Sequence, residues 1–299
     1  MFTLAHLSDP HLAPLPRPQP GELFNKRITG YLNWLRGRHR MHRREVLDAI
    51  VADVKAAGAD HIAVTGDIAN ISLAEEFLRG RKWLDALGKP SDVTFIPGNH
   101  DAYVRAAAHD PERYWADYMS GDGEDGPVAF PFVRRRGAIA LIGTSTAVPT
   151  PPFMATGWLG QAQIARLAAV LDALKKENLF RVLLIHHPPV SPRERSKRLL
   201  DAADVLKVVA THGAELILHG HDHVPMLNWL DTPNGRAAAI GVPSASGAPA
   251  FAKAPAAWNL YRISGARGAW QCEMISRAIT RDGSIAEISR ANVSPANAR

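Results

Sequence analysis

Up to about residue 225, two patterns of apolar residues alternate along the chain. Short apolar runs predict strands, whereas apolar residues spaced three or four positions apart predict amphipathic helices. The runs predict strands at 2–8, 61–65, 93–96, 139–143, 181–185 and 215–218. The helical spacing predicts helices at 43–57, 73–87 and 160–174.

The last part of the chain, from about residue 224, shows apolar runs only. They predict strands at 226–229, 237–240, 259–263 and 270–275, joined by turns such as Pro233-Asn234-Gly235. Alternating strands and helices followed by successive strands indicate an α/β fold of the mixed α+β kind, with helices flanking the sheets. No linker interrupts the pattern, so we expect a single domain over 1–299, frayed from about Asn292.

The composition is that of a globular protein. Of the 299 residues, 46% are hydrophobic and 21% charged, and no run approaches the roughly 20 apolar residues of a membrane span. The single cysteine, Cys272, cannot form an intramolecular disulfide, which favours a reducing compartment. The first apolar run leads directly to Asp9 and lacks the features of a secretory signal. We therefore expect a cytoplasmic protein, either free or peripheral at the inner membrane surface.

The net charge of +6 comes from one segment, 24–44. It contains no acidic residue and seven basic ones: Lys26, Arg27, Arg36, Arg38, Arg40, Arg43 and Arg44. The rest of the chain is nearly neutral, so nucleic acid is not a favoured partner. Apolar residues within the segment follow a helical stripe: Phe24, Ile28, Tyr31, Leu32 and Leu35.

Two interpretations of this segment remain open. It is either a basic amphipathic helix that lies on a membrane surface, or a cap-like insertion that packs on the domain with its basic face in solvent. Because it follows the first polar motif, we expect it to overhang the functional site. There it would attract an anionic substrate or a lipid surface.

Polar motifs follow five of the predicted strands. They are Ser8-Asp9-Pro10-His11, Gly66-Asp67, Gly98-Asn99-His100-Asp101, His186-His187 and Gly220-His221-Asp222-His223. Functional groups converge at the C-terminal ends of strands in sheets with α/β crossovers. We therefore expect these side chains to form one site.

The residue types in these motifs indicate a metal site. Carboxylate, carboxamide oxygen and imidazole nitrogen suit Mn²⁺, Fe, Co²⁺ or Zn²⁺. A glycine beside several of them lets the backbone turn or approach closely. Taken singly, an Asp or Asn after a strand is usually a turn residue, so only the whole set carries the prediction. Seven candidate ligands are too many for one ion and suit two that share a ligand.

The five motifs, in this order over residues 1 to about 225, resemble those of the calcineurin-like metallophosphoesterases. The resemblance implies a four-layer αββα sandwich of two mixed β-sheets flanked by helices. It implies that one ion is held by Asp9, His11, Asp67 and His223. It implies that the other is held by Asp67, Asn99, His186 and His221. His186 is preferred to His187 because proline falls two residues after it.

The resemblance also implies a mechanism. Two divalent ions, Mn²⁺ first and Fe or Zn²⁺ as alternatives, activate a water molecule that attacks phosphorus. His100 resembles the catalytic histidine of the family and would protonate the leaving oxygen, with Asp101 orienting it. Apart from the resemblance, His187 and Arg27 are candidate substrate contacts, and His187 stays open between lining the pocket and belonging to a plain loop.

The motifs Gly98–Asp101 and His186–Pro189 are similar to those of bacterial cyclic-nucleotide and glycerophosphodiester enzymes, which predicts a phosphodiesterase. The alternative is a membrane-surface pyrophosphatase for a UDP-diacylglucosamine-like precursor of lipid A. The segment 24–44 favours this alternative, although the commonest such enzyme carries Arg in place of His100. A nuclease is less favoured because its relatives add a DNA-binding domain. A scaffold like the retromer subunit is less favoured because such proteins lose ligands that are present here.

Overall fold

The computed structural model describes residues 1–295, and residues 296–299 lie outside the described part of the chain. The prediction that the chain frays from about Asn292 is wrong for Asn292 and Val293. The last strand runs through Asn292, and Val293 is buried with its N–H donating to the carbonyl of Cys272 at 2.8 Å.

The first of two six-stranded sheets has the order β12-β11-β10-β1-β2-β3. Its parallel strands are β1 (Phe2–Leu7), β2 (His61–Val64) and β3 (Val93–Phe95). The antiparallel strands are β10 (Ala257–Ser264), β11 (Gln271–Ile279) and β12 (Ile285–Asn292). In the register, Leu4 of β1 lies between His61 and Tyr261, so the end of the chain completes the sheet that its beginning starts.

The second sheet has the order β4-β5-β6-β7-β9-β8. Its parallel strands are β5 (Ile139–Gly143), β6 (Phe180–Leu184), β7 (Leu216–His219) and β9 (Gly235–Gly241). The antiparallel edges are β4 (Phe132–Arg136) and β8 (Met226–Thr232). Thr232 pairs with Gly235 across the predicted turn, which confirms that hairpin.

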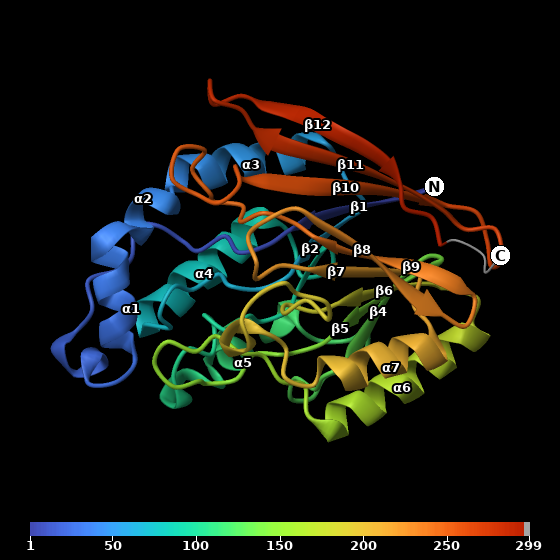
Figure 1. The fold of residues 1–299 in the computed structure, drawn as a ribbon, viewed down its shortest axis with the longest axis horizontal. Coiled ribbons are helices and arrows are strands. Elements are labelled where there is room, and N and C mark those ends of the chain that lie inside the picture. The colour runs from blue at the N-terminus through green and yellow to red at the C-terminus, as the bar shows by residue number, and fades with distance from the viewer. Residues whose placement is uncertain (296–299) are drawn as a thin grey trace.

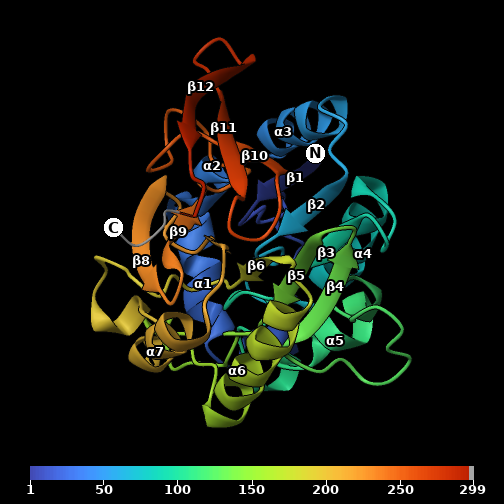
Figure 2. The same ribbon diagram turned by 90° about the vertical axis from the view of Figure 1, so that its right-hand side faces the viewer.

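The two sheets pack face to face with helices outside them. These helices are α3 (Arg44–Ala56), α4 (Ala74–Leu87), α5 (Asp110–Trp115), α6 (Gln161–Lys176) and α7 (Ala202–His212). Helix α3 packs against β10, β11 and β12, and α7 packs against β8 (Figures 1 and 2). This arrangement confirms the predicted sandwich of two mixed sheets flanked by helices.

Neighbouring residues of β6 show how the layers form. Leu184 belongs to the core between the sheets, whereas Leu183 packs with Leu167 of α6 and Val205 of α7. Successive side chains of a strand point to opposite faces, so a continuous apolar run buries both faces of the sheet.

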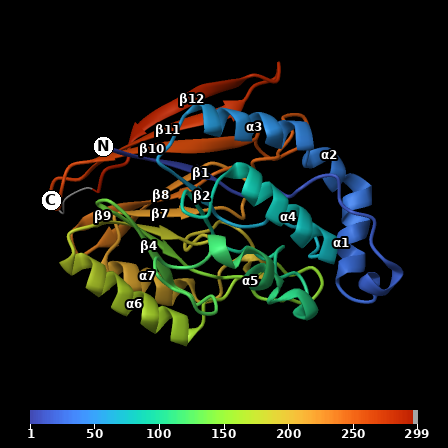
Figure 3. The same ribbon diagram turned by 180° about the vertical axis from the view of Figure 1, so that it is seen from behind.

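The segment 24–44 forms α1 (Arg27–Asn33), a π-helical turn (Trp34–Arg38) and the short helix α2 (His39–Met41). These elements lie at the end of the sandwich toward which β1 runs (Figures 1 and 3). No helix within residues 1–295 combines the length and the apolar character needed to cross a bilayer.

Candidate metal centre

The five polar motifs meet at one end of the sandwich. They follow β1, β2 and β3 in the first sheet and β6 and β7 in the second, so the two packed sheets bring their loops together. One ligand atom from each of Asp9, Asp67 and His186 lies within 4.8 Å of the other two. Residues more than 170 positions apart in the chain therefore share one buried centre.

The first group of potential ligands surrounds His11. Its Nδ1 donates to the carbonyl of Ala69 at 3.0 Å, so its Nε2 carries a lone pair toward the centre. This Nε2 lies 3.3 Å from His223 Nε2, 3.9 Å from Asp9 Oδ1 and 3.8 Å from Asp67 Oδ2. His223 Nε2 also lies 3.0 Å from Asp9 Oδ1. Four of the predicted residues thus present nitrogen or oxygen atoms to one point.

The second group surrounds His186, on the other side of Asp67. Its Nδ1 donates to the carbonyl of Thr65 at 2.6 Å, and its Nε2 lies 3.4 Å from Asp67 Oδ2 and 3.3 Å from Asn99 Oδ1. His221 Nδ1 lies 3.0 Å from Asn99 Oδ1, because its Nε2 donates to the carbonyl of Lys197 at 2.8 Å. Asp67 Oδ2 faces a histidine of each group, which suits a shared ligand.

The charges of these residues fit a cation. Burial opposes ionisation of Asp9, but His223 outweighs it and lowers the pKa of this carboxyl far below its usual value. Burial alone would lower the pKa of His186, yet Asp67 raises it to about 10. In both pairs the buried carboxylate acts on a neighbouring imidazole rather than on solvent. Buried carboxylates require such compensation, and a metal ion supplies more of it.

The backbone is strained where these side chains attach. Five of the seven predicted ligands have left-handed φ angles: Asp9 (52°), His11 (35°), Asp67 (61°), His221 (67°) and His223 (57°). Such conformations cost about 1–3 kcal/mol each for a residue with a side chain and cluster at functional sites. Hydrogen bonds between the loops hold them, such as His11 N–H to the carbonyl of Asp67 at 3.0 Å.

The glycines beside the ligands allow close approach, as predicted. A Cβ on Gly98 would lie 2.2 Å from Asp67 Oδ1, and one on Gly220 would lie 2.3 Å from Asp9 Oδ2. Real Cβ atoms do not come so near, so any side chain at either position would displace a carboxylate of the centre.

The expected role of Asp101 is wrong in its detail. Its carboxylate accepts the N–H groups of Asp67 (2.7 Å), Ala69 (2.8 Å) and Gly98 (2.9 Å). The ring of His100 is instead oriented by the carbonyl of Asn70, to which its Nδ1 donates. Asp101 therefore joins the loops after β2 and β3 and positions the ligands rather than His100.

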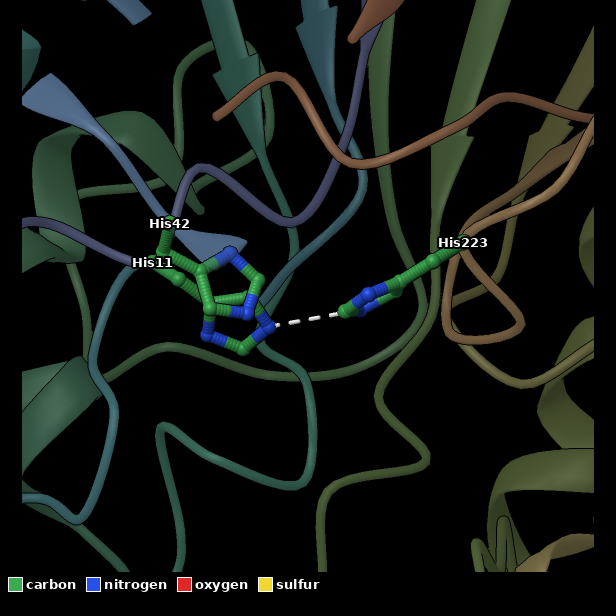
Figure 4. A group of neighbouring side chains, drawn as sticks. All are labelled: His11, His42 and His223. Atoms are coloured by element: carbon green, nitrogen blue, oxygen red, sulfur yellow. Dashed lines mark hydrogen bonds between the residues drawn. The ribbon is translucent and has the colours of Figure 1, made fainter. Parts of the chain in front are cut away.

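Two residues that the motifs did not identify, Arg38 and His42, also reach the centre. Arg38 Nη1 lies 3.3 Å from His100 Nε2, and Arg38 Nη2 lies 3.4 Å from the Nε2 atoms of His11 and His42. The His42 ring lies 4.4 Å from that of His11, centroid to centroid, and forms a group with His11 and His223 (Figure 4). Arg38 and His42 are four residues apart, a helical spacing, in a segment expected to overhang the site. That spacing could have identified them from the sequence.

The two residues expected to contact the substrate, His187 and Arg27, are both buried and bonded to other parts of the protein. His187 is buried, accepts from the Thr146 hydroxyl at 2.7 Å and donates to the carbonyl of Ala155 at 3.2 Å. Both of its nitrogens are engaged, and its ring packs on His221 at 4.1 Å, so it supports a ligand.

Arg27 is buried as well and donates to the carbonyls of Ile71 and Ser72. It fastens α1 to the loop after β2. The polar side-chain atoms of His187 and Arg27 thus bond to the protein itself, and direct contact of either residue with the substrate stays a prediction.

A cavity of about 220 Å³ opens onto the centre. Four basic side chains line it: Arg38, Arg193, Lys197 and Lys253. Two aspartates, Asp67 and Asp222, also line the cavity, and Asp222 is paired with Arg193 at 3.0 Å, so the basic side chains outnumber the acidic ones. Burial and then Arg38 lower the pKa of His100 to about 3. The cavity is positive and suits an anionic substrate.

Comparison with curated protein sequences finds no match to this chain. A family model described as calcineurin-like phosphoesterase matches residues 2–225. A dimetal phosphatase from Danio rerio has a similar structure, with a TM-score of 0.65 at 15% identity over 99% of both chains. Purple acid phosphatase PPD1 from yellow lupin (Lupinus luteus) gives 0.57 at 12% identity, over 98% of this chain and 53% of that one. At these identities the two structures show a shared fold.

Proposed function

The chain belongs to the calcineurin-like phosphoesterase family, and from that premise we propose that it hydrolyses a phosphodiester with two bound metal ions. One observation carries the proposal. Seven oxygen- and nitrogen-bearing side chains from five strand ends converge on a buried centre, and the carbonyls that orient His11 and His186 turn a lone pair of each toward it.

The two groups around Asp67 suit two ions. Asp9, His11, Asp67 and His223 would hold one, and Asp67, Asn99, His186 and His221 would hold the other. Carboxylate, carboxamide and imidazole ligands without thiolates favour Mn²⁺, with Fe or Zn²⁺ as alternatives. When bound, such ions lower the pKa of water and offset the charge that develops on phosphoryl oxygens.

Residues of the chain itself would orient the substrate and supply a proton. In diester hydrolysis a water oxygen bonds to phosphorus, the bond to the leaving oxygen breaks, and the leaving alcohol takes one proton. His100 presents Nε2 to the cavity because its Nδ1 donates to the carbonyl of Asn70. It would give a proton from Nε2 only as the imidazolium, which burial and Arg38 disfavour in the free protein and which the negative charge of a bound phosphoester would favour. Arg38, 3.3 Å away, would donate to a phosphoryl oxygen.

The preference for a diester rests on the sequence motifs around Asn99 and His186. The positive cavity supports an anionic substrate of either kind. The alternative, a pyrophosphatase for a UDP-diacylglucosamine-like lipid A precursor, is favoured by one observation. Helix α1, beside the cavity, exposes Ile28 and Leu32 to solvent, as a protein working at a lipid surface would.

The first test is hydrolysis of bis(p-nitrophenyl) phosphate beside the monoester p-nitrophenyl phosphate, after metal removal and reloading with Mn²⁺. Metal-dependent diester cleavage that exceeds the monoester rate, and that Asp67→Ala abolishes, is expected. Faster cleavage of the monoester would contradict the diesterase proposal and indicate a phosphomonoesterase. Release of UMP from UDP-diacylglucosamine with little diester cleavage would favour the pyrophosphatase.

A further inference from the structure

We infer that one face of the segment 24–44 docks the protein on an anionic lipid bilayer. The docking face consists of large apolar side chains that all stand exposed: Phe24, Ile28, Leu32, Leu35 and Phe153. Phe24 is 88% and Phe153 84% exposed. Exposed apolar residues are common singly, but a contiguous group of this kind marks an interaction surface.

The orientation of α1 prevents the apolar side chains of this face from being buried in the protein. The helix packs through the opposite side, where Arg27, Gly30 and Trp34 are buried. A Cβ on Gly30 would lie 2.5 Å from the Ile71 side chain and 2.8 Å from the Tyr103 hydroxyl, so the helix already touches the domain. The polar bonds of Arg27 hold the same side. Helix α1 therefore cannot roll to bury Ile28 and Leu32.

Phe153 extends the docking face from a different part of the chain. Lys26 Nζ donates to Thr150 Oγ1 at 2.6 Å and to the carbonyl of Met154 at 2.9 Å, which ties this loop to the start of α1. Phe153 itself has a φ of 66°, a conformation that bulky side chains rarely adopt. The fold thus holds an aromatic ring in solvent at a cost in backbone energy.

The charge around the face selects the partner. The segment 24–44 has no acidic residue, and Arg36 and Arg40 are exposed beside the stripe. Aromatic and aliphatic side chains flanked by arginines match the surface of an anionic bilayer. A second copy of the chain would bring the same arginines against each other in a symmetric contact, which their repulsion disfavours.

Docking would place the bilayer beside the catalytic cavity. Arg38, which continues the same segment, reaches the cavity while the stripe faces outward. A phosphoester with an apolar tail would then enter from the lipid surface. The docking inference does not depend on the proposed reaction, because binding to lipid is measured without turnover.

The test is sedimentation of the whole protein with vesicles of phosphatidylcholine, alone or mixed with phosphatidylglycerol. Ile28→Asp is compared with Ile288→Asp, a matched control on β12 with 58% exposure against 48% for Ile28. We expect binding to the mixed vesicles, weakening with salt, with partitioning lowered at least about tenfold in Ile28→Asp and unchanged in Ile288→Asp. Both variants should keep the circular dichroism spectrum and the thermal unfolding midpoint of the unaltered protein, which shows that they are folded.

Equal vesicle binding by Ile28→Asp and the unaltered protein would overturn the inference. So would equal binding to vesicles with and without phosphatidylglycerol, or no binding to either. Analytical ultracentrifugation supplies another outcome that contradicts it: if the protein is a dimer that Ile28→Asp dissociates, the face is a contact between copies.

Discussion

The loops of the metal centre and the segment 24–44 meet at the same cavity but are built in opposite ways. The loops bury charged side chains, hold five of them on left-handed backbone and satisfy them with one another. The segment clamps one face with Arg27 and leaves its apolar side chains in solvent. The buried loops have the donor atoms that suit an ion inside the protein, whereas the exposed apolar face of the segment is the feature on which we base the proposed docking to a bilayer.

The largest effect is expected from Asp67→Asn, which changes the side chain that the two groups of ligands share. The amide keeps the shape but removes the charge that faces His11 and His186. Diester hydrolysis should fall by roughly 10⁴-fold, equivalent to about 5.5 kcal/mol in the barrier. Metal content by mass spectrometry should fall below two ions per chain. Full metal content with unchanged turnover would contradict the shared-ligand role.

His100→Ala should separate proton transfer from metal binding. We expect two ions to remain and the rate on a diester with a poor leaving group to fall about 10²–10⁴-fold. The loss should shrink with p-nitrophenolate, which leaves without a proton. If both substrates slow equally, His100 acts by positioning or charge and not as an acid.

Arg38→Ala and Arg36→Ala test which part of the segment belongs to the cavity. Arg38 touches His100, His11 and His42, whereas Arg36 is exposed on the same segment. We expect kcat/KM on a soluble diester to fall roughly 10- to 100-fold in Arg38→Ala and to stay unchanged in Arg36→Ala. Equal effects in the two variants would mean that the segment acts only through its general charge.

The smallest effect on catalysis is expected from Arg27→Gln, which removes the hydrogen bonds that join α1 to the loop after β2. The carbonyls of Ile71 and Ser72 lose a buried donor, so the free energy of unfolding in urea should fall by about 1–3 kcal/mol. Because Arg27 is buried and donates to backbone carbonyls, kcat/KM should change by less than about threefold. Arg17→Gln, at an exposed position, is the control. A large rise in KM with unchanged stability would instead support direct contact between Arg27 and the substrate.

Elements whose stability depends on distant partners were not predicted. The three arginines of β4 resemble a polar loop, yet Arg134 is buried and donates to the carbonyls of Pro90, Val93, Asp117 and Ser120. Only the folded chain supplies those four acceptors. Strand β12 is an edge strand with mostly exposed side chains, so it lacks the apolar run that identifies its neighbours.

The order and chemical types of the seven predicted ligands could be read from the chain because each motif is local: a strand ends, and the next residues carry the polar groups. The apolar pattern indicated mixed sheets flanked by helices, and the family resemblance of the motifs implied the αββα layering. Contacts between distant residues decided the rest. The carbonyl of Ala69 selects which nitrogen of His11 faces the centre, and Asn70 rather than Asp101 orients His100. The position of Gly30 against Tyr103 decides that the apolar face of α1 points outward. A local pattern specifies what a side chain can do, whereas its direction depends on groups that only tertiary packing brings within hydrogen-bonding or van der Waals distance.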